Sequence, residues 1–509
     1  MQYDDIIVGA GSSGAVLAAR LSEDPVRTVL LLEAGPDYPT IGQTPDDLLH
    51  SFASMAAHDW GLAAQATPGR EIPYPRGMVT GGSSAVNATM ALRGTPQDFD
   101  EWVEWGNDEW SFAKVLPFYR KLENDRDYSG DFHGTSGPIL IERLPKQTWQ
   151  PIGSAFFEAC RATGFAEVTD HNDPASTGVG PTPRNRHNQV RISTAIGYLA
   201  PARNRLNLTI RSAVNVHRVL VENGRAIGVE LECGGVIQRV HGLRVTISAG
   251  AINSPAMLMR SGIGPHNELE ELGINCLLNL AGVGKNLIDH PMLFIAAKPV
   301  PGVAHDVDVT TPVIVRYTAG SSREFNDMQL GAYIFFDEAL IPGFSWLTPP
   351  PIVLFTPGLQ RPRSRGHLRL TTADPDVPPE IHINFVNDSE DVRRMLEGVR
   401  IAWRVMHGPH LSPYIKEILG LTQEIVDSDS ALADFIRDNC TTNFHPVATA
   451  RMGPESDRMA VVDQYCRVHG VEGLRVVDAS VMPNIVRANT NLTCIMIGER
   501  VAQWMRAQK

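Results

Sequence analysis

The chain has 509 residues, of which 45 are basic and 57 acidic, so its formal net charge is −12. This balance argues against a nucleic-acid-binding protein, because binding many phosphates needs concentrated Lys and Arg. Hydrophobic residues make up 43% of the chain, which excludes a disordered protein, and no apolar run reaches the roughly 18 residues of a membrane span.

The first 35 residues predict a strand, a glycine-rich turn, a helix and a second strand. The apolar run Ile6-Ile7-Val8 leads into Gly9-Ala10-Gly11-Ser12-Ser13-Gly14, and the apolar run from Thr28 to Leu32 ends at Glu33. Continuous apolar runs of this kind are typical of parallel strands that are buried on both faces. The segment is therefore expected to begin a parallel sheet.

The glycine pattern of this turn predicts a dinucleotide-binding site. Gly9 permits the tight turn, Gly11 lets the backbone approach a pyrophosphate, and Gly14 lets the helix lie close to the strand. The phosphates would then lie at the positive end of the helix. Glu33, 19 positions after Gly14, is placed to bind an adenosine ribose. This pattern alone leaves NAD and FAD open.

The rest of the chain predicts further strands and three helices. Short strands separated by turns at Asn223-Gly224 and Gly234-Gly235 are expected at Leu208 to Ile210, Val214 to Leu220, Ile227 to Leu231 and Arg244 to Ser248. From about residue 296 the pattern favours antiparallel strands, at Val313 to Tyr317, Ile352 to Phe355 and His367 to Thr371. Helical patterns occupy 389–407, 430–439 and Leu492 to Met505.

The six cysteines form no CxxC pair, so neither a zinc ribbon nor a disulfide framework is predicted. His407 and His410 have a spacing seen in metal sites, but no further ligand completes a set, and no metal site is expected. The N-terminus lacks a basic segment followed by an apolar stretch. We therefore expect no signal peptide and a cytoplasmic location.

Longer motifs follow in order and span almost the whole chain. They are Pro75 to Asn87 (PRGMVTGGSSAVN), Ser248 to Pro255 (SAGAINSP) with Ser261 to Pro265, Val283 to Leu287 with Asp289-His290-Pro291, His445-Pro446 with Arg451 to Gly453, and Arg475 to Ser480 with Ala488 to Asn491. Together these motifs resemble the signatures of the glucose–methanol–choline (GMC) flavoprotein oxidoreductases.

The resemblance implies an α/β fold, in which a Rossmann-like FAD-binding domain carries an inserted α+β substrate-binding domain built on an antiparallel sheet. The FAD-binding domain would comprise residues 1–295, with excursions of the substrate domain near 150–190. Residues 296–440 would form the substrate-binding domain. Residues 441–509 would return to the FAD-binding domain and carry the catalytic pair.

The resemblance also implies the residues that bind FAD. They are Gly9, Gly11, Ser12, Ser13, Gly14, Glu33, Ala34, Val79, Gly82, Ser83, Asn87, Ala88, Thr89, Met90, Val216, Ala249, Gly250, Asp478, Ala479, Asn489, Thr490 and Asn491. Some members attach FAD covalently through a histidine just before the asparagine of the flavin loop. Val86 occupies that position here and cannot form the bond, so FAD is expected to be non-covalent.

Catalysis is assigned by the resemblance to His445 and to Asn489, which follows 44 positions later. An imidazole, with an ordinary pKa near ~6.5, is suited to take a hydroxyl proton near neutral pH. The Asn489 amide can hydrogen-bond the hydroxyl but cannot titrate. His290 is expected to be structural rather than catalytic.

The resemblance predicts FAD-dependent oxidation of a primary alcohol to an aldehyde by hydride transfer to flavin N5. The chain looks closest to bacterial hydroxymethylfurfural-oxidase-like and choline-dehydrogenase-like members, and an aryl or furanic alcohol is favoured. An aliphatic alcohol or choline-type dehydrogenase is the alternative. Alternatives of another class are a lyase or a photodecarboxylase of the same fold, and a non-catalytic flavin-binding protein. The expected partners are the small-molecule alcohol and either oxygen or a quinone-type electron acceptor, without nucleic acid.

Overall fold

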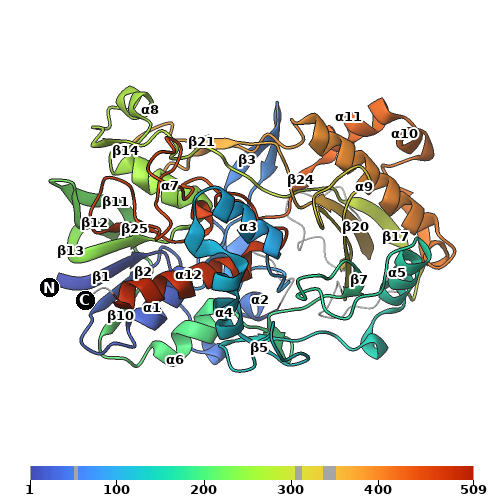
Figure 1. The fold of residues 1–509 in the computed structure, drawn as a ribbon, viewed down its shortest axis with the longest axis horizontal. Helices are drawn as coiled ribbons and strands as arrows, with labels where there is room; N and C mark the ends of the chain where they lie inside the picture. Colours follow the sequence, from blue (N-terminus) through green and yellow to red (C-terminus); the bar gives the residue numbers. More distant parts are fainter. Residues whose placement is uncertain (1, 51–55, 304–311, 336–350, 508–509) are drawn as a thin grey trace.

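The computed structural model describes residues 2–50, 56–303, 312–335 and 351–507. These segments build two large sheets that lie side by side, each with helices packed against it (Figure 1). Within the described residues, no helix is long and apolar enough to cross a membrane. All six cysteines are free thiols.

The first sheet contains the strands predicted for a dinucleotide-binding fold. Its strands are β1 (Gln2–Val8), β2 (Val29–Leu32), β10 (Leu208–Arg211), β11 (Asn215–Glu222), β12 (Arg225–Cys233), β13 (Val236–Ile247) and β25 (Leu474–Val476). β10, β2, β1, β13 and β25 run parallel, and β11 and β12 join them as antiparallel strands. The helices α1 (Gly14–Leu21) and α12 (Thr490–Ala507) pack against each other beside this sheet. α1 also contacts β2, whose four apolar residues are all buried.

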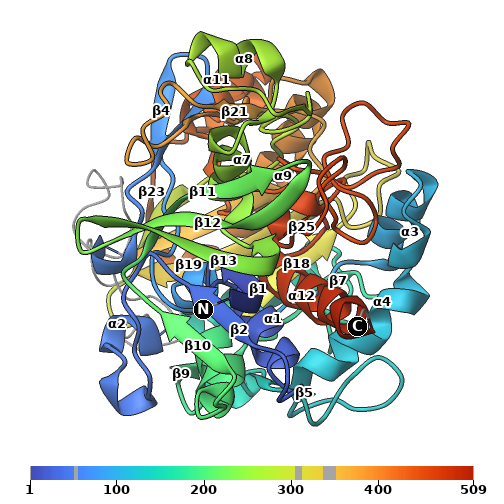
Figure 2. The ribbon, with the colours of Figure 1, turned by 90° about the vertical axis from the view of Figure 1, so that its left-hand side faces the viewer.

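The strand β13 begins eight residues before its predicted start at Arg244. Its first half pairs with β12 in a hairpin that projects beyond the parallel strands (Figure 2). Most side chains there are exposed, so the segment lacks the apolar run on which the prediction depended. Both predicted turns are present, and Asn223, Gly224, Gly234 and Gly235 all have positive φ, as tight hairpins require.

The second sheet is antiparallel and combines distant parts of the chain. Its strands are β7 (Gly178–Pro181), β16 (Pro291–Met292), β17 (Ile295–Pro299), β18 (Val313–Tyr317), β19 (Met328–Phe335), β20 (Ile352–Leu359), β23 (Ile415–Leu419) and β24 (Thr441–Thr442). The helices α5 (Pro151–Ala162) and α9 (Ser389–His407) contact its strands, and α11 (Asp429–Asn439) packs on α9. The predicted domain boundaries at 295 and 440 stay a prediction.

The strand expected at His367 to Thr371 lies in another sheet. It is β21 (His367–Arg369), which joins β22 (Glu380–His382), β3 (Ala63–Thr67) and β4 (Arg70–Pro73) in a separate four-stranded sheet. Its antiparallel pairing with β22 agrees with the local pattern. Which larger sheet a short strand joins is decided by long-range packing, and the local pattern contains no information on it.

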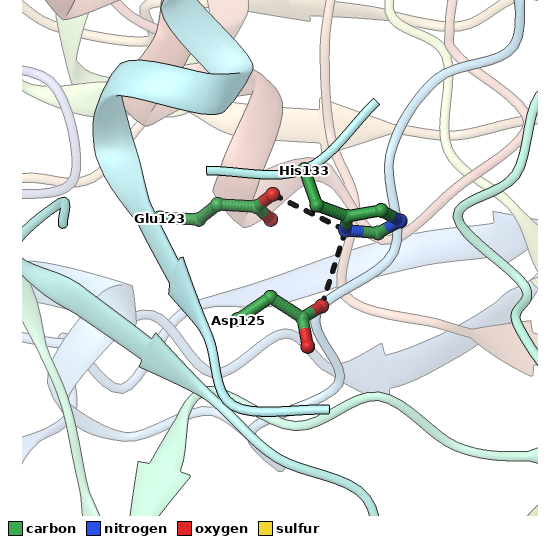
Figure 3. Close-up of side chains that lie close together, drawn as sticks. All are labelled: Glu123, Asp125 and His133. Atoms are coloured by element: carbon green, nitrogen blue, oxygen red, sulfur yellow. Dashed lines mark ion pairs between the residues drawn. The ribbon is translucent and has the colours of Figure 1, made fainter. Parts of the chain in front are cut away.

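A buried ion network lies next to α4 (Phe112–Leu122), on β5 (Glu123–Asp125) and the loop that follows. Nδ1 of His133 lies 3.3 Å from Glu123 and 3.2 Å from Asp125, and Nε2 lies 2.9 Å from Asp170 (Figure 3 shows the first two). Burial opposes a charge on His133, but the hydrogen bonds to these carboxylates outweigh it and raise the pKa of His133 to about 10.

Three of these side chains, Glu123, Asp125 and His133, lie close enough together to hold a metal ion. Two arginines already neutralise the carboxylates, because Arg93 pairs with Glu123, and Arg143 pairs with Asp125 and Asp170. Together with protonated His133 they balance the three negative charges. We therefore interpret the cluster as an ion network that ties the loop to its neighbours.

Replacing His133 with Gln is expected to destabilise the protein by about 3 kcal/mol near pH 6.5, because it leaves buried carboxylates without a cation. The folded-state pKa is raised, so this stabilisation is complete below the ordinary pKa of about 6.5 and is lost as the pH rises through about 10. Urea unfolding at pH 6.5 and pH 10 measures the difference. The half-exposed His187, changed to Gln, serves as the control, and an equal effect of both substitutions would contradict the network.

Candidate active site

A cavity of about 460 Å³ is lined by residues from both large sheets. Val8 of β1 and Val216 of β11 come from the first sheet, and Met292 of β16 and Tyr333 of β19 come from the second. The beginning of α12 completes the wall. The cavity is long enough to bring the predicted dinucleotide-binding residues and the predicted catalytic pair into one continuous space.

Most of the predicted site residues line this cavity. They are Gly9, Gly11, Ser12, Ser13, Glu33, Ala34, Gly82, Ser83, Asn87, Ala88, Met90, Val216, Ala249, Gly250, His445, Asp478, Ala479, Asn489, Thr490 and Asn491. Residues that are far apart in the chain therefore meet at one place, although their roles toward a cofactor stay predictions.

Three predicted residues, Gly14, Val79 and Thr89, are not part of the lining. Val79 is fully buried in a small apolar cluster with Val86, which does line the cavity. Thr89 has a positive φ of 60°, and its hydroxyl accepts a hydrogen bond from Arg184 at 3.1 Å. Val79 therefore supports a lining residue without reaching the cavity itself.

Two glycine positions on the wall leave no room for a side chain. A Cβ on Gly9, where φ is +96°, would lie 2.4 Å from the carbonyl oxygen of Ser248. A Cβ on Gly82, where φ is +51°, would lie 2.8 Å from Cα of Gly11. The glycine turn and the predicted flavin loop (residues 79–90) therefore touch through their backbones, which forms a narrow cradle suited to an extended pyrophosphate.

Glu33 directly follows β2, and its carboxylate is turned to the glycine turn. Its two oxygens accept hydrogen bonds from the backbone N–H groups of Ala10 and Gly35, both at 2.9 Å. Burial raises the pKa of Glu33 to about 7, against the opposing effect of these hydrogen bonds. A carboxylate oxygen carries further lone pairs, so the side chain can still accept hydrogen bonds from a ribose.

The last helix begins at Thr490, two residues before its predicted start. Ser12 donates a hydrogen bond to Oδ1 of Asn491 at 2.9 Å, which joins the glycine turn to this helix. Within the described residues, Nδ2 of Asn491 and Oδ1 of Asn489 are buried without a hydrogen-bond partner. These unpaired polar atoms, the helix N-terminus and the glycine cradle fit a bound flavin dinucleotide.

The loop from Pro375 to Pro378 also lines the cavity, and sequence reasoning did not place it at the site. Asn215 donates a hydrogen bond to Asp376 at 3.1 Å, and Arg260 donates one to the carbonyl of Val377 at 2.9 Å. The loop therefore covers the end of the cavity next to Val216. The proline cluster at 375–379 predicts a loop, and no local signal could have placed it at this site.

The short strands β16 and β24 bring two motifs together. Pro291 pairs with Thr442, and Met292 pairs with Thr441, in antiparallel register. As a result Asn443 donates its backbone N–H to the carbonyl of His290 at 3.0 Å. His290, which directly precedes β16, thus lies beside the segment that carries His445.

His445 makes a polar contact on each side of its ring. Nε2 lies 3.1 Å from Nδ2 of Asn489, and Nδ1 lies 2.9 Å from Nδ1 of His290. The two imidazole rings meet edge to face, with an interplanar angle of 83°. Asp289 accepts the backbone N–H of His445 at 2.9 Å and does not contact the ring through this bond.

Both histidines are held in the neutral form. Burial, followed by the proximity of His290 and of Arg76, lowers the pKa of His445 well below its usual value. Burial also lowers the pKa of His290 to about 3. A neutral imidazole offers one lone pair, so His445 can act as a proton acceptor at neutral pH.

The wall beside the predicted catalytic pair is apolar and aromatic. Tyr333 donates a hydrogen bond to the sulfur of Met90 at 3.1 Å, and that sulfur lies 4.0 Å from the Asn489 amide. Phe444 has a positive φ of 63° and a side chain that is 41% exposed, and it lines the cavity next to His445. Met292 and Phe294 complete this wall.

The carboxylates of the lining belong to other parts of the cavity. Among the described lining residues they are Glu33, Asp376 and Asp478. Glu33 lies at the glycine turn, and Asp376 lies at the loop over Val216. Asp478 accepts hydrogen bonds from the Gly250 backbone and from Ser254, so its carboxylate is already hydrogen-bonded within the protein.

Comparison with known proteins gives a consistent result. Two models of GMC oxidoreductase match residues 3–292 and 362–498. An oxygen-dependent choline dehydrogenase of Pseudomonas putida is 36% identical, with 100% of this chain and 94% of the relative covered. Pyridoxine 4-oxidase from Mesorbium loti has a similar structure, with a TM-score of 0.90, 30% identity and complete coverage of both chains. A fungal aryl-alcohol oxidase follows at a TM-score of 0.83 and 25% identity, with 99% of each chain covered.

Proposed function

The chain belongs to the GMC oxidoreductase family of FAD-dependent enzymes that act on alcohol-type donors, and we propose that it oxidises a primary aryl or furanic alcohol to the aldehyde. One observation supports this proposal above the others. The Nε2 atom of neutral His445 and the amide of Asn489 lie 3.1 Å apart and face a common cavity with an aromatic wall.

The two side chains have distinct tasks in the proposed reaction. Nε2 of His445 accepts the hydroxyl proton of the alcohol, and Nδ2 of Asn489 donates a hydrogen bond to the alcohol oxygen as negative charge develops on it. FAD, when bound, supplies the acceptor for the hydride that leaves the same carbon. The buried position of His445 keeps the base neutral until the substrate arrives.

The chemistry of the wall favours an uncharged aromatic ring as the substrate. Phe444 and Tyr333 can pack against such a ring, and the sulfurs of Met90 and Met292 make favourable contacts with aromatic edges. A cationic alcohol such as choline would gain most from a carboxylate near the reacting end. The described residues beside His445 provide none, so a choline-type activity is the weaker alternative.

An alcohol panel scored by anaerobic loss of the yellow flavin colour tests the reaction and the substrate together. Benzyl alcohol and 5-hydroxymethylfurfural are expected to reduce the flavin faster than hexanol or choline. Preferred reduction by choline would favour the dehydrogenase alternative. An oxidised flavin with every alcohol would contradict the proposed function and favour a lyase or a photodecarboxylase.

We expect FAD to be bound without a covalent link, because Val86 lines the cavity at the predicted attachment position. Acid precipitation of the yellow protein should leave a colourless pellet and release all flavin into the supernatant as intact FAD. A pellet that stays yellow after washing would contradict this prediction. Absorbance of both fractions measures the outcome.

The electron acceptor and the location of the enzyme are also proposals. Oxygen and a quinone-type compound are the two acceptors considered, and hydrogen peroxide formation compared with reduction of a quinone-like dye distinguishes them. We propose a cytoplasmic location on the sequence alone.

A further inference from the structure

We propose that His290 is a positioning residue that holds His445 in the tautomer whose Nε2 is unprotonated and can accept a proton. The inference rests on the proposed function, because it assigns His290 a role in the proton transfer of the same reaction. His290 is not among the residues expected to be catalytic. It contacts Nδ1 of the His445 ring, and the Asn489 amide contacts Nε2 of the same ring.

The hydrogen bonds on the two sides of the His445 ring determine where its proton lies. The Asn489 amide faces Nε2 with its nitrogen, which can only donate, so Nε2 must accept. In a neutral imidazole the proton then resides on Nδ1. At 2.9 Å, Nδ1 of His445 donates to Nδ1 of His290, which in turn must carry its own proton on Nε2.

The surroundings of His290 agree with this assignment. The ring is fully buried, and the backbone carbonyls of Gln360 and Val486 favour a proton on it. Within the described residues, its Nε2 completes no hydrogen bond of normal geometry, so the firm contact of the ring is the one to His445. The main chain of His290 is held by the hydrogen bond that its carbonyl accepts from the Asn443 backbone N–H.

The proposed step balances as a simple proton transfer. The O–H bond of the alcohol breaks and an N–H bond forms on Nε2 of His445, while the hydride leaves for FAD. The new imidazolium keeps its Nδ1–H bond to His290, which is a neutral acceptor. A carboxylate in this place would hold the proton more strongly, but Asp289 binds the backbone of His445 instead.

Charged groups around the pair influence its protonation as well. Arg76 lowers the pKa of His445, whereas Asp98 and Arg361 act on the pKa of His290 in opposite directions. Asp289 itself accepts hydrogen bonds from Tyr74 and Thr442. These groups remain in place when only His290 is replaced, so a substitution of His290 isolates the ring contact.

The test compares His290→Leu with His290→Asn in the FAD-loaded protein. Leu removes the acceptor, and we expect the limiting rate of anaerobic flavin reduction to fall about 100-fold, as for loss of a partner that orients a functional histidine. The dissociation constant of the alcohol should not change. The acid limb of the rate should shift along the pH axis, because the group that contacts Nδ1 of His445 has changed. Asn, whose amide oxygen can replace Nδ1, should restore most of the rate.

A matched control separates positioning from folding. His171 is also a buried histidine and contacts the carbonyl of Ile314, away from His445. A purely structural role predicts that His290→Leu and His171→Leu lose FAD content and Tm alike, with an unchanged pH profile. That result, or a wild-type rate in His290→Leu, would overturn the proposal.

A second measurement does not depend on turnover. Nitrogen NMR of histidine-labelled holoprotein, with His445 assigned through the His445→Asn variant, should show a protonated Nδ1 and an unprotonated Nε2. The reverse tautomer would overturn the inference even if no alcohol reduces the flavin. Conversely, the expected tautomer in a protein that no alcohol reduces would contradict the proposed function alone.

Discussion

Replacing His445 with Ala should give a yellow, FAD-loaded protein whose flavin is reduced by alcohol at least about 1,000-fold more slowly than in the wild type. The substitution removes the imidazole whose Nε2 faces the Asn489 amide and the cavity. Within the described residues, no other imidazole is in contact with this amide. Alanine is small enough for the site, and Asp289 still accepts the backbone N–H of residue 445, so FAD binding should persist. Anaerobic stopped-flow absorbance measures the rate.

The assignment of His445 as the base also predicts how the rate of flavin reduction depends on pH. The pKa of His445 is lowered, so its neutral form already dominates above the ordinary value of about 6.5. The limiting reduction rate of the wild type should therefore stay constant from pH 8 to about 6.5 and fall only at lower pH. His407→Ala, which removes a part-buried histidine on α9, is the control. Undiminished alcohol oxidation by His445→Ala would exclude it as the base.

The second large effect is expected from Gly14→Ala, which should give a protein with almost no FAD. A Cβ at this position would lie 1.9 Å from the carbonyl oxygen of Gly9 and 3.0 Å from Cβ of Ser248. The nearer contact is with backbone, so the start of α1 would have to move away from the glycine turn. We expect a loss of stability above about 4 kcal/mol, the exceptional range for a single substitution.

The flavin-to-protein absorbance ratio and urea unfolding of the same samples measure this effect. Gly42→Ala provides the matched control, because a Cβ at Gly42 meets no atom within 4 Å. Full FAD content in Gly14→Ala would show that α1 can move away from the glycine turn without loss of FAD binding. The close approach would then have no role in cofactor binding.

Several elements of the fold could be predicted because their signals are local. The apolar runs of β1 and β2 indicated buried strands, and the Asn223-Gly224 turn indicated a hairpin. Boundaries were less accurate where residues are exposed or polar. β13 starts earlier than expected, and α12 starts at Thr490, because polar residues at these ends fit a loop as well as a helix or a strand.

By itself, the sequence determined the family, because long motifs in the family's order cover almost the whole chain. It also predicted the FAD site in outline and the pair His445 and Asn489. The tertiary structure alone decided how these residues are supported. His290 reaches His445 across 155 positions only because β16 pairs with β24, and the loop at Pro375 reaches the cavity only through Asn215 and Arg260. Such contacts depend on long-range strand pairing and packing, and no local pattern encodes them.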